Sequence, residues 1–169
     1  MAGTKVNVKT VWGKKEKKSS IKINATTLGG ALEELLKLPE WGEFDGKLDV
    51  DHKANSKGHV TEVTLKPSYT ILMPTWAGYG KATKTCRGEW DRMWKKLDEH
   101  ENGHRLIHLE ALAAIQSHLQ MQTDLTVEQF EADLARMMED GQSKQEKFDA
   151  ATGHGSKKGV VLNVSAACA

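Results

Sequence analysis

A long stretch in the middle of the chain carries apolar residues at three- and four-residue steps. It runs from residue 88 to residue 119 without a proline. Its stripe consists of Trp90, Met93, Trp94, Leu97, His104, Ala111 and Ile115. This spacing is typical of one face of an α-helix, because about 3.6 residues complete a helical turn. The pattern therefore predicts one long helix over residues 88–119.

Before this helix, apolar and polar residues mostly alternate, which is typical of strands. We expect five strands, at residues 5–12, 21–25, 48–52, 61–65 and 69–73. The lysine-rich residues 13–20 are predicted to form a hairpin loop. One short helix follows the second strand, capped by Thr27 and ended before Pro39. Trp41 and Phe44 are then expected to fill the core.

A second amphipathic helix is predicted over residues 127–148, after a capping box formed by Thr126 and Gln129. Gly153 and Gly155 predict a sharp helix stop. The fold class that follows is α+β, with a small, mostly antiparallel or mixed sheet, a short helix, and then two long helices. We expect a single domain over residues 1–169, because this length supports one core and is marginal for two.

Composition narrows the classes of function. Hydrophobic residues make up 38% of the 169 residues and charged residues 28%, which is typical of a soluble globular protein. The net charge of +1 predicts no general attraction to nucleic acid or to a membrane surface. The N-terminus has no apolar signal core, so the sequence leaves the compartment open, as it does the oligomeric state. For Cys86 and Cys168 we expect two free thiols, with a single bridge as the alternative.

The predicted long helix contains the string His100-Glu101-Asn102-Gly103-His104, an HExxH motif. On a helix, His100 and His104 lie one above the other about 6 Å apart, so their imidazoles can bind one metal ion. Glu101 is turned about 100° from His100 and can reach a metal-bound water without being a ligand. This arrangement predicts one catalytic zinc ion with Glu101 as the general base.

A catalytic zinc needs a third protein ligand. His108 is unsuitable because it lies about 12 Å along the helix from His100, so we expect it to line the cleft or support a ligand. The other candidates are Glu128, Glu131, Asp149 and His154. We prefer His154, because glycines on both sides leave room for a metal centre. Asp149 would then orient a ligand histidine.

Three features occur in a fixed order along the chain. The first is the strand end Leu72-Met73-Pro74-Thr75-Trp76, the second is the helix from Trp90 to His104, and the third is the segment from Phe148 to Gly155. Together they resemble the bacterial predicted secreted zinc-dependent proteases called domain-of-unknown-function family 922. This resemblance implies a zincin-like metallopeptidase fold, a catalytic zinc ion and a secreted or periplasmic location, and it supports a role for His154.

We therefore expect a zinc-dependent metalloprotease that acts on peptides or proteins, with no nucleic-acid or membrane partner. Tyr79, in the loop before the long helix, is the candidate for a hydrogen-bond donor to the oxyanion, against the simpler reading of a loop tyrosine. Three alternatives stay open. They are a catalytically degenerate zinc-binding interaction module, a zinc hydrolase of a non-peptide amide, and a chance HExxH on a structural helix.

Overall fold

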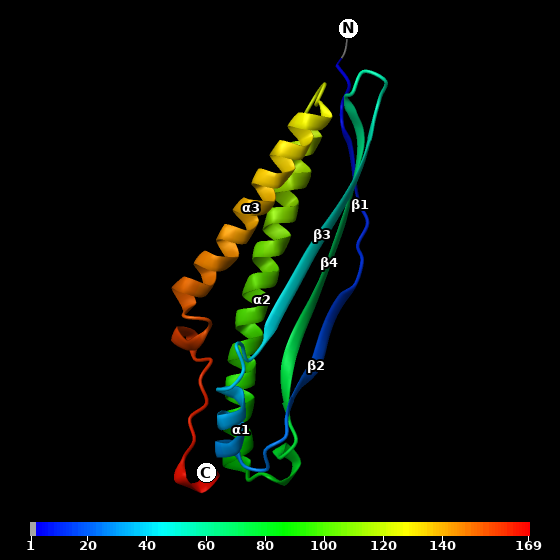
Figure 1. Ribbon diagram of the computed structural model, residues 1–169. Coiled ribbons are helices and arrows are strands. Elements are labelled where there is room, and N and C mark those ends of the chain that lie inside the picture. The colour runs from blue at the N-terminus through cyan, green and yellow to red at the C-terminus, as the bar shows by residue number, and fades with distance from the viewer. Residues whose placement is uncertain (1–2) are drawn as a thin grey trace. The chain divides into compact units, whose positions relative to one another are not determined.

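The protein combines one sheet with three helices, as the computed structural model shows for residues 3–169 (Figure 1). Along the chain the elements are β1 (Asn7–Thr10), β2 (Lys15–Ile23), α1 (Leu28–Leu35), β3 (Glu43–Ala54), β4 (Val60–Trp76), α2 (Lys84–Met121) and α3 (Val127–Thr152). Short 3-10 turns occupy Tyr79–Lys81, Ser156–Lys158 and Ala166–Cys168. The predicted α+β class is therefore confirmed.

Contacts divide the chain into two compact units. Unit 1 holds the chain up to Lys15 together with Gly46–Tyr69 and Arg105–Glu146. Unit 2 holds Glu16–Asp45, Thr70–His104 and Lys147–Ala169. The elements β4, α2 and α3 each contribute residues to both units. The expectation of a single domain over residues 1–169 stays a prediction.

The sheet differs from the predicted one in strand direction. β1 runs parallel to β4, with Val8 opposite Val63 and Thr10 opposite Leu65. This parallel pairing corrects the expectation of a mostly antiparallel or mixed sheet. Alternation of apolar residues identifies the buried face of a strand but not the direction of its neighbour. The long connection between β1 and β4 is what a parallel pair requires.

Two further expectations about strands were wrong. The lysine-rich residues predicted as a loop form most of β2, whose lysines lie on exposed positions of the strand. In unit 2, Lys17 pairs with Asp98 and its ammonium group lies 5.7 Å from the centre of the Trp94 ring. The predicted fourth and fifth strands are one strand, β4, which pairs with β1, β2 and β3.

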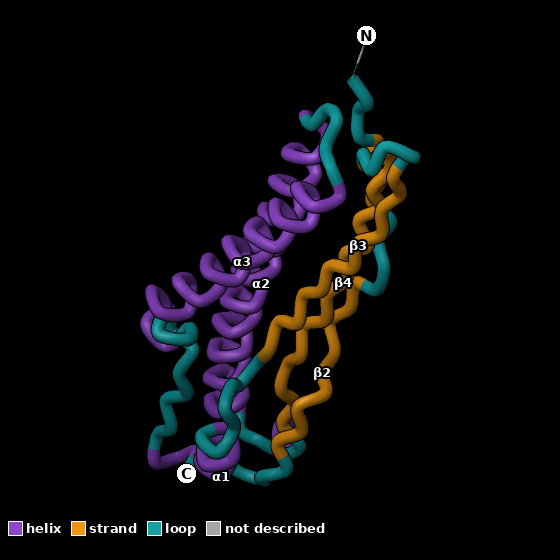
Figure 2. Tube along the Cα trace, turned by 45° about the horizontal axis from the view of Figure 1, so that its top comes forward, coloured by secondary structure: helices purple, strands orange, loops and turns teal. Residues whose placement is uncertain are grey.

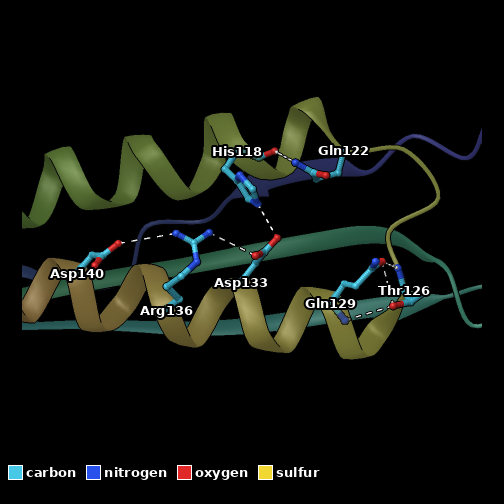
Figure 3. A network of polar contacts seen from close by, with 7 residues as sticks. All are labelled: His118, Gln122, Thr126, Gln129, Asp133, Arg136 and Asp140. Carbon is cyan, nitrogen blue, oxygen red and sulfur yellow. Dashed lines mark hydrogen bonds and ion pairs between the residues drawn. The ribbon is translucent and has the colours of Figure 1, made fainter.

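In unit 1, the second part of α2 packs with α3 over an apolar core. The fully buried members of this core include Val60, Val63, Leu65, Ile115, Leu119 and Phe130. The predicted capping box is confirmed, because the Gln129 N–H donates to the Thr126 hydroxyl at 3.2 Å and the Thr126 N–H donates to the Gln129 side chain at 3.1 Å (Figure 3). Beside it, His118 Nε2 lies 2.8 Å from an oxygen of Asp133, which connects the two helices.

In unit 2, a disulfide joins Cys86, near the start of α2, to Cys168, near the end of the chain. Their Cα atoms are 5.7 Å apart, within the usual range for a disulfide. The expectation of two free thiols is therefore wrong. Sequence separation hid the pairing, because 82 residues lie between the two positions and only the fold brings them together.

The helices of the described residues 3–169 include none that is both long enough and apolar enough to cross a membrane.

Candidate metal centre

Three side chains of unit 2 form a group that could hold a metal ion. They are His100 and His104 on α2 and Asp149 on α3, and their ligand atoms all lie within 4.8 Å of one another. The Nε2 atoms of His100 and His104 lie 3.3 Å and 2.9 Å from the same oxygen of Asp149. Both histidines are buried, with 7% and 9% of their surfaces exposed. Two imidazoles and one carboxylate therefore converge on one point.

The helix positions the two histidines on one side, four residues apart, as the sequence predicted. Aromatic packing then fixes their rings. Phe148, directly before Asp149, stacks on His100 with ring centres 5.1 Å apart and meets His104 edge-on at 4.9 Å. Phe44 stacks on the His104 ring at 6.4 Å, so it supports the site and does not merely fill the core. Sequence reasoning missed both roles, because aromatic residues near a motif are usually core residues.

Two glycines allow this packing. A Cβ atom on Gly103 would lie 2.4 Å from the ring of Phe148, so the middle of the HExxH motif must be small here. A Cβ atom on Gly155 would lie 3.2 Å from the ring of His100 and 2.6 Å from Val160, and the φ of this glycine is +81°. At these two positions only glycine allows the backbone to lie so close to the rings of Phe148 and His100.

Burial favours the neutral, metal-binding form of His100. The pKa of His100 is lowered, first by burial and then by the neighbouring charge of His104, while Asp149 opposes the shift. Within residues 3–169, no group forms a hydrogen bond with the buried Nδ1 of His100, so packing against Phe148 holds this ring. Two imidazoles with a carboxylate form a donor set that suits a divalent transition metal.

Glu101 lies in the buried interior beside this group, with 4% of its surface exposed. Its pKa is raised to about 8, mainly by burial and then by the negative charges of Glu40, Asp149 and Glu43. The backbone N–H of Phe44 forms a hydrogen bond with the carboxylate and opposes the shift. A Cβ atom on Gly42 would lie 2.9 Å from Oε1 of Glu101, so the chain before β3 lies directly against this carboxyl group.

His154, the residue preferred as third ligand, lies at the edge of the group and outside the three-donor set. Its side chain is 72% exposed, and its Nδ1 is 3.9 Å from the carboxylate of Asp149. The backbone is left-handed at His154 and at the glycines on both sides, and the His154 N–H donates to the Asp149 carbonyl at 3.0 Å. The helix stop predicted from the glycines is therefore confirmed. Asp149, expected to orient a histidine, supplies the third donor.

The remaining candidates are not members of the three-donor group. His108, Glu128 and Glu131 belong to unit 1, and burial lowers the pKa of His108. The Tyr79 hydroxyl donates to Asp91 at 3.0 Å, which raises the pKa of Tyr79. This contact with Asp91 favours the simpler interpretation of Tyr79 as an ordinary loop tyrosine.

A cavity of about 490 Å³ opens beside this candidate metal-binding group, entirely within unit 2. His100, His104, Asp149 and His154 line one part of it. Most of the other lining residues are apolar and come from α1, the loop after it, and the C-terminal tail. Trp41 is one of them, so it contributes to the cavity rather than to the core alone.

The fold and the site define an α+β protein with a group of two histidines and one aspartate that could hold a metal ion. The family described as bacterial protein of unknown function (DUF922) matches residues 23–155, and the chain belongs to this family. The matched range includes all three potential ligands. No curated protein and no solved structure matches the chain.

Proposed function

We propose that this protein is a zinc-dependent peptidase in which His100, His104 and Asp149 hold the ion and Glu101 is the general base. The observation that carries the proposal is the convergence of three donor atoms within 4.8 Å of one another, two of them on the helix that also bears the buried Glu101. A structural zinc site is usually closed by four protein ligands, whereas three leave a position open for water. The three-donor group thus favours a catalytic site.

The donor set and the motif together favour zinc. Two histidines and a carboxylate also suit iron(II) in some oxygenases. The HExxH motif places a glutamate directly beside the first ligand, which is the arrangement of zinc hydrolases. When bound, zinc would polarise the scissile carbonyl and lower the pKa of a bound water toward neutrality.

The chain's own residues would move the proton. Glu101 would accept it from the attacking water and deliver it to the leaving amine. The raised pKa of Glu101 reflects its burial and the neighbouring carboxylates, and a nearby cation would favour the carboxylate form that a base needs. His154, exposed at the edge of the group, would donate a hydrogen bond to the substrate carbonyl oxygen.

Removal and return of the metal tests this function. The protein as isolated is expected to cleave denatured casein, to lose this activity on treatment with a chelator, and to regain it with equimolar zinc. Magnesium serves as the control, because it prefers oxygen ligands and should restore nothing. Cleavage that persists in the metal-free protein would contradict the proposal.

Two other functions remain as alternatives from the sequence. A zinc-binding interaction module would retain zinc and cleave nothing, and a hydrolase of a non-peptide amide would retain zinc and leave casein intact. The buried Glu101 beside the ligands favours a hydrolase over the module, because a buried carboxyl group without a role is costly.

The disulfide between Cys86 and Cys168 bears on the place of action. Disulfides persist mainly outside the reducing cytosol. We therefore place the proposed peptidase in an oxidising compartment, in agreement with the secreted or periplasmic location that the family resemblance implies.

A further inference from the structure

The cavity beside the metal-binding group has an apolar wall that the proposed reaction does not use. One side of this wall is formed by Leu32 of α1 and by Leu36 directly after that helix. Trp41 from the following loop and Val160 and Leu162 from the C-terminal tail form the rest. Figures 1 and 2 both show α1 and this tail next to the first half of α2. The volume of about 490 Å³ lies within the range of about 300–1,000 Å³ that is common for ligand sites.

Specific contacts hold the C-terminal tail in place, so its part of the cavity wall is well defined. The guanidinium group of Arg92 donates to the carbonyl oxygens of Gly159 at 3.0 Å and Val161 at 2.6 Å. The side chain of Glu89 accepts from the Asn163 N–H at 2.6 Å, and it also holds Arg92 at 2.7 Å. The disulfide anchors the far end of the tail. Contacts at both ends therefore hold Val160–Leu162 beside the metal-binding group.

Apolar side chains remain exposed in this cavity. Leu36 is 67% exposed and Val161 37% exposed, and both line it. Exposed large apolar side chains that cluster in a concave site usually mark a binding surface. Among the described residues that line the cavity there is no lysine or arginine, while Glu40 and Asp149 contribute carboxylates. Away from the metal-binding group, an acidic side chain would therefore find no lysine or arginine to pair with.

From these contacts we infer that the cavity binds a bulky apolar side chain of a peptide, such as leucine or phenylalanine. In the proposed peptidase this is the side chain next to the scissile bond, because the same cavity is lined by His100, His104 and Asp149. The statement about cleavage rests on the proposed function, whereas the statement about binding does not. The occupant is a side chain of the substrate, held by the walls of α1 and the tail while its backbone lies at the metal-binding group.

A peptide series tests this selectivity. The zinc-loaded protein is given peptides of one sequence that carry Phe, Leu, Ala or Asp at a single position, and cleavage at that position is followed by mass spectrometry. Loss of one methylene from a ligand in an apolar pocket changes kcat/KM by about 10-fold or more. We therefore expect Phe and Leu to exceed Ala by at least about 10-fold, and Asp to be cleaved least.

Two variants place a charge on the exposed part of the wall, where the fold tolerates it. Leu36→Asp and Val161→Asp should each lower the Leu-to-Ala ratio toward one while zinc content is retained. Leu106→Asp and Val11→Asp are the matched controls, because these apolar residues are also exposed but do not line the cavity. The controls should keep the parent's ratio. Cleavage without apolar preference, or a preference that survives both wall variants, would overturn the inference and leave the peptidase proposal standing.

If no peptide of the series is cleaved, the peptidase proposal fails, and binding alone decides the inference. Binding of N-acetyl-phenylalaninamide and N-acetyl-alaninamide to the zinc-loaded protein is then measured by NMR titration. Tighter binding of the phenylalanine compound, lost in Leu36→Asp and kept in Leu106→Asp, supports the cavity as a site for apolar side chains. Equal binding, or none, overturns it.

Discussion

Gly103 shows how one residue joins the motif to the rest of the site. The two variable positions of HExxH are Asn102 and Gly103 in this chain. The ring of Phe148 occupies the space that a side chain at Gly103 would fill. That ring contacts both His100 and His104, and the next residue along α3 is Asp149. Because Gly103 has no side chain, Phe148 can pack against α2, and Asp149 then lies next to the two histidines.

Asp149 belongs to the three-donor group and His154 does not, a difference that the sequence could not show. Sequence spacing alone placed both at the exit of the second helix and favoured His154 for the room around it. The structure adds the direction of the side chains, since the carboxylate of Asp149 points between the two imidazoles, while the side chain of His154 is mostly exposed. Local sequence patterns do not contain this information, because it depends on how far α3 continues before its glycine stop.

Substitution of these two residues separates a ligand from a neighbour. Asp149→Asn keeps the size of the side chain but removes its charge, so we expect zinc affinity to fall by about 10-fold or more. His154→Ala should retain zinc, since the side chain lies outside the three-donor group. It should lower kcat, since the proposed hydrogen bond to the substrate carbonyl oxygen is lost. Zinc competition with a chromogenic chelator measures the first effect, and peptide turnover the second. Loss of zinc from His154→Ala together with its retention in Asp149→Asn would reverse the assignment.

At the scale of elements, the helices were predicted better than the sheet. Helix caps are local, and the Thr27 hydroxyl accepts from the Gly30 N–H at 3.1 Å as the sequence indicated. The direction and partners of a strand are set by residues far away in the chain, which is why the parallel pairing of β1 with β4 was missed. The lysine-rich strand β2 was missed because its charged residues conceal the alternation.

The C-terminal tail is the element whose stability depends most on a covalent link. Replacement of both cysteines, Cys86→Ser with Cys168→Ser, should lower the free energy of unfolding by about 2–4 kcal/mol, because the disulfide restricts a long loop in the unfolded chain. Urea denaturation under oxidising conditions measures the loss. The parent protein with a reducing agent is the control and should approach the stability of the double variant. Equal stability of the oxidised parent and the double variant would contradict this role.

At the scale of the whole molecule, the candidate site belongs to unit 2 alone. All three donors, Glu101 and the cavity come from residues 16–45, 70–104 and 147–169. Each of these segments is distant from the others in sequence, and only the helix segment carries a motif that can be recognised alone. This explains why the sequence pointed to His100, Glu101 and His104 as candidates but not to the aromatic support, the apolar wall or the disulfide.

The family match extends over both units and ends at the helix stop. It covers residues 23–155, which includes the three donors and most of the sheet. The tail that forms one wall of the cavity follows this range. Selectivity for a side chain, as inferred for the cavity, would therefore depend partly on residues outside the matched part of the chain.

The central claim, that Glu101 is the base of a zinc peptidase, is tested most directly by one comparison of zinc content and peptide turnover. Glu101→Gln preserves the shape of the side chain, and Glu110→Gln makes the same change at an exposed position of α2. We predict that both variants bind equimolar zinc, and that kcat falls by at least about 100-fold in Glu101→Gln only. Turnover that survives in zinc-loaded Glu101→Gln at the level of Glu110→Gln would contradict the account.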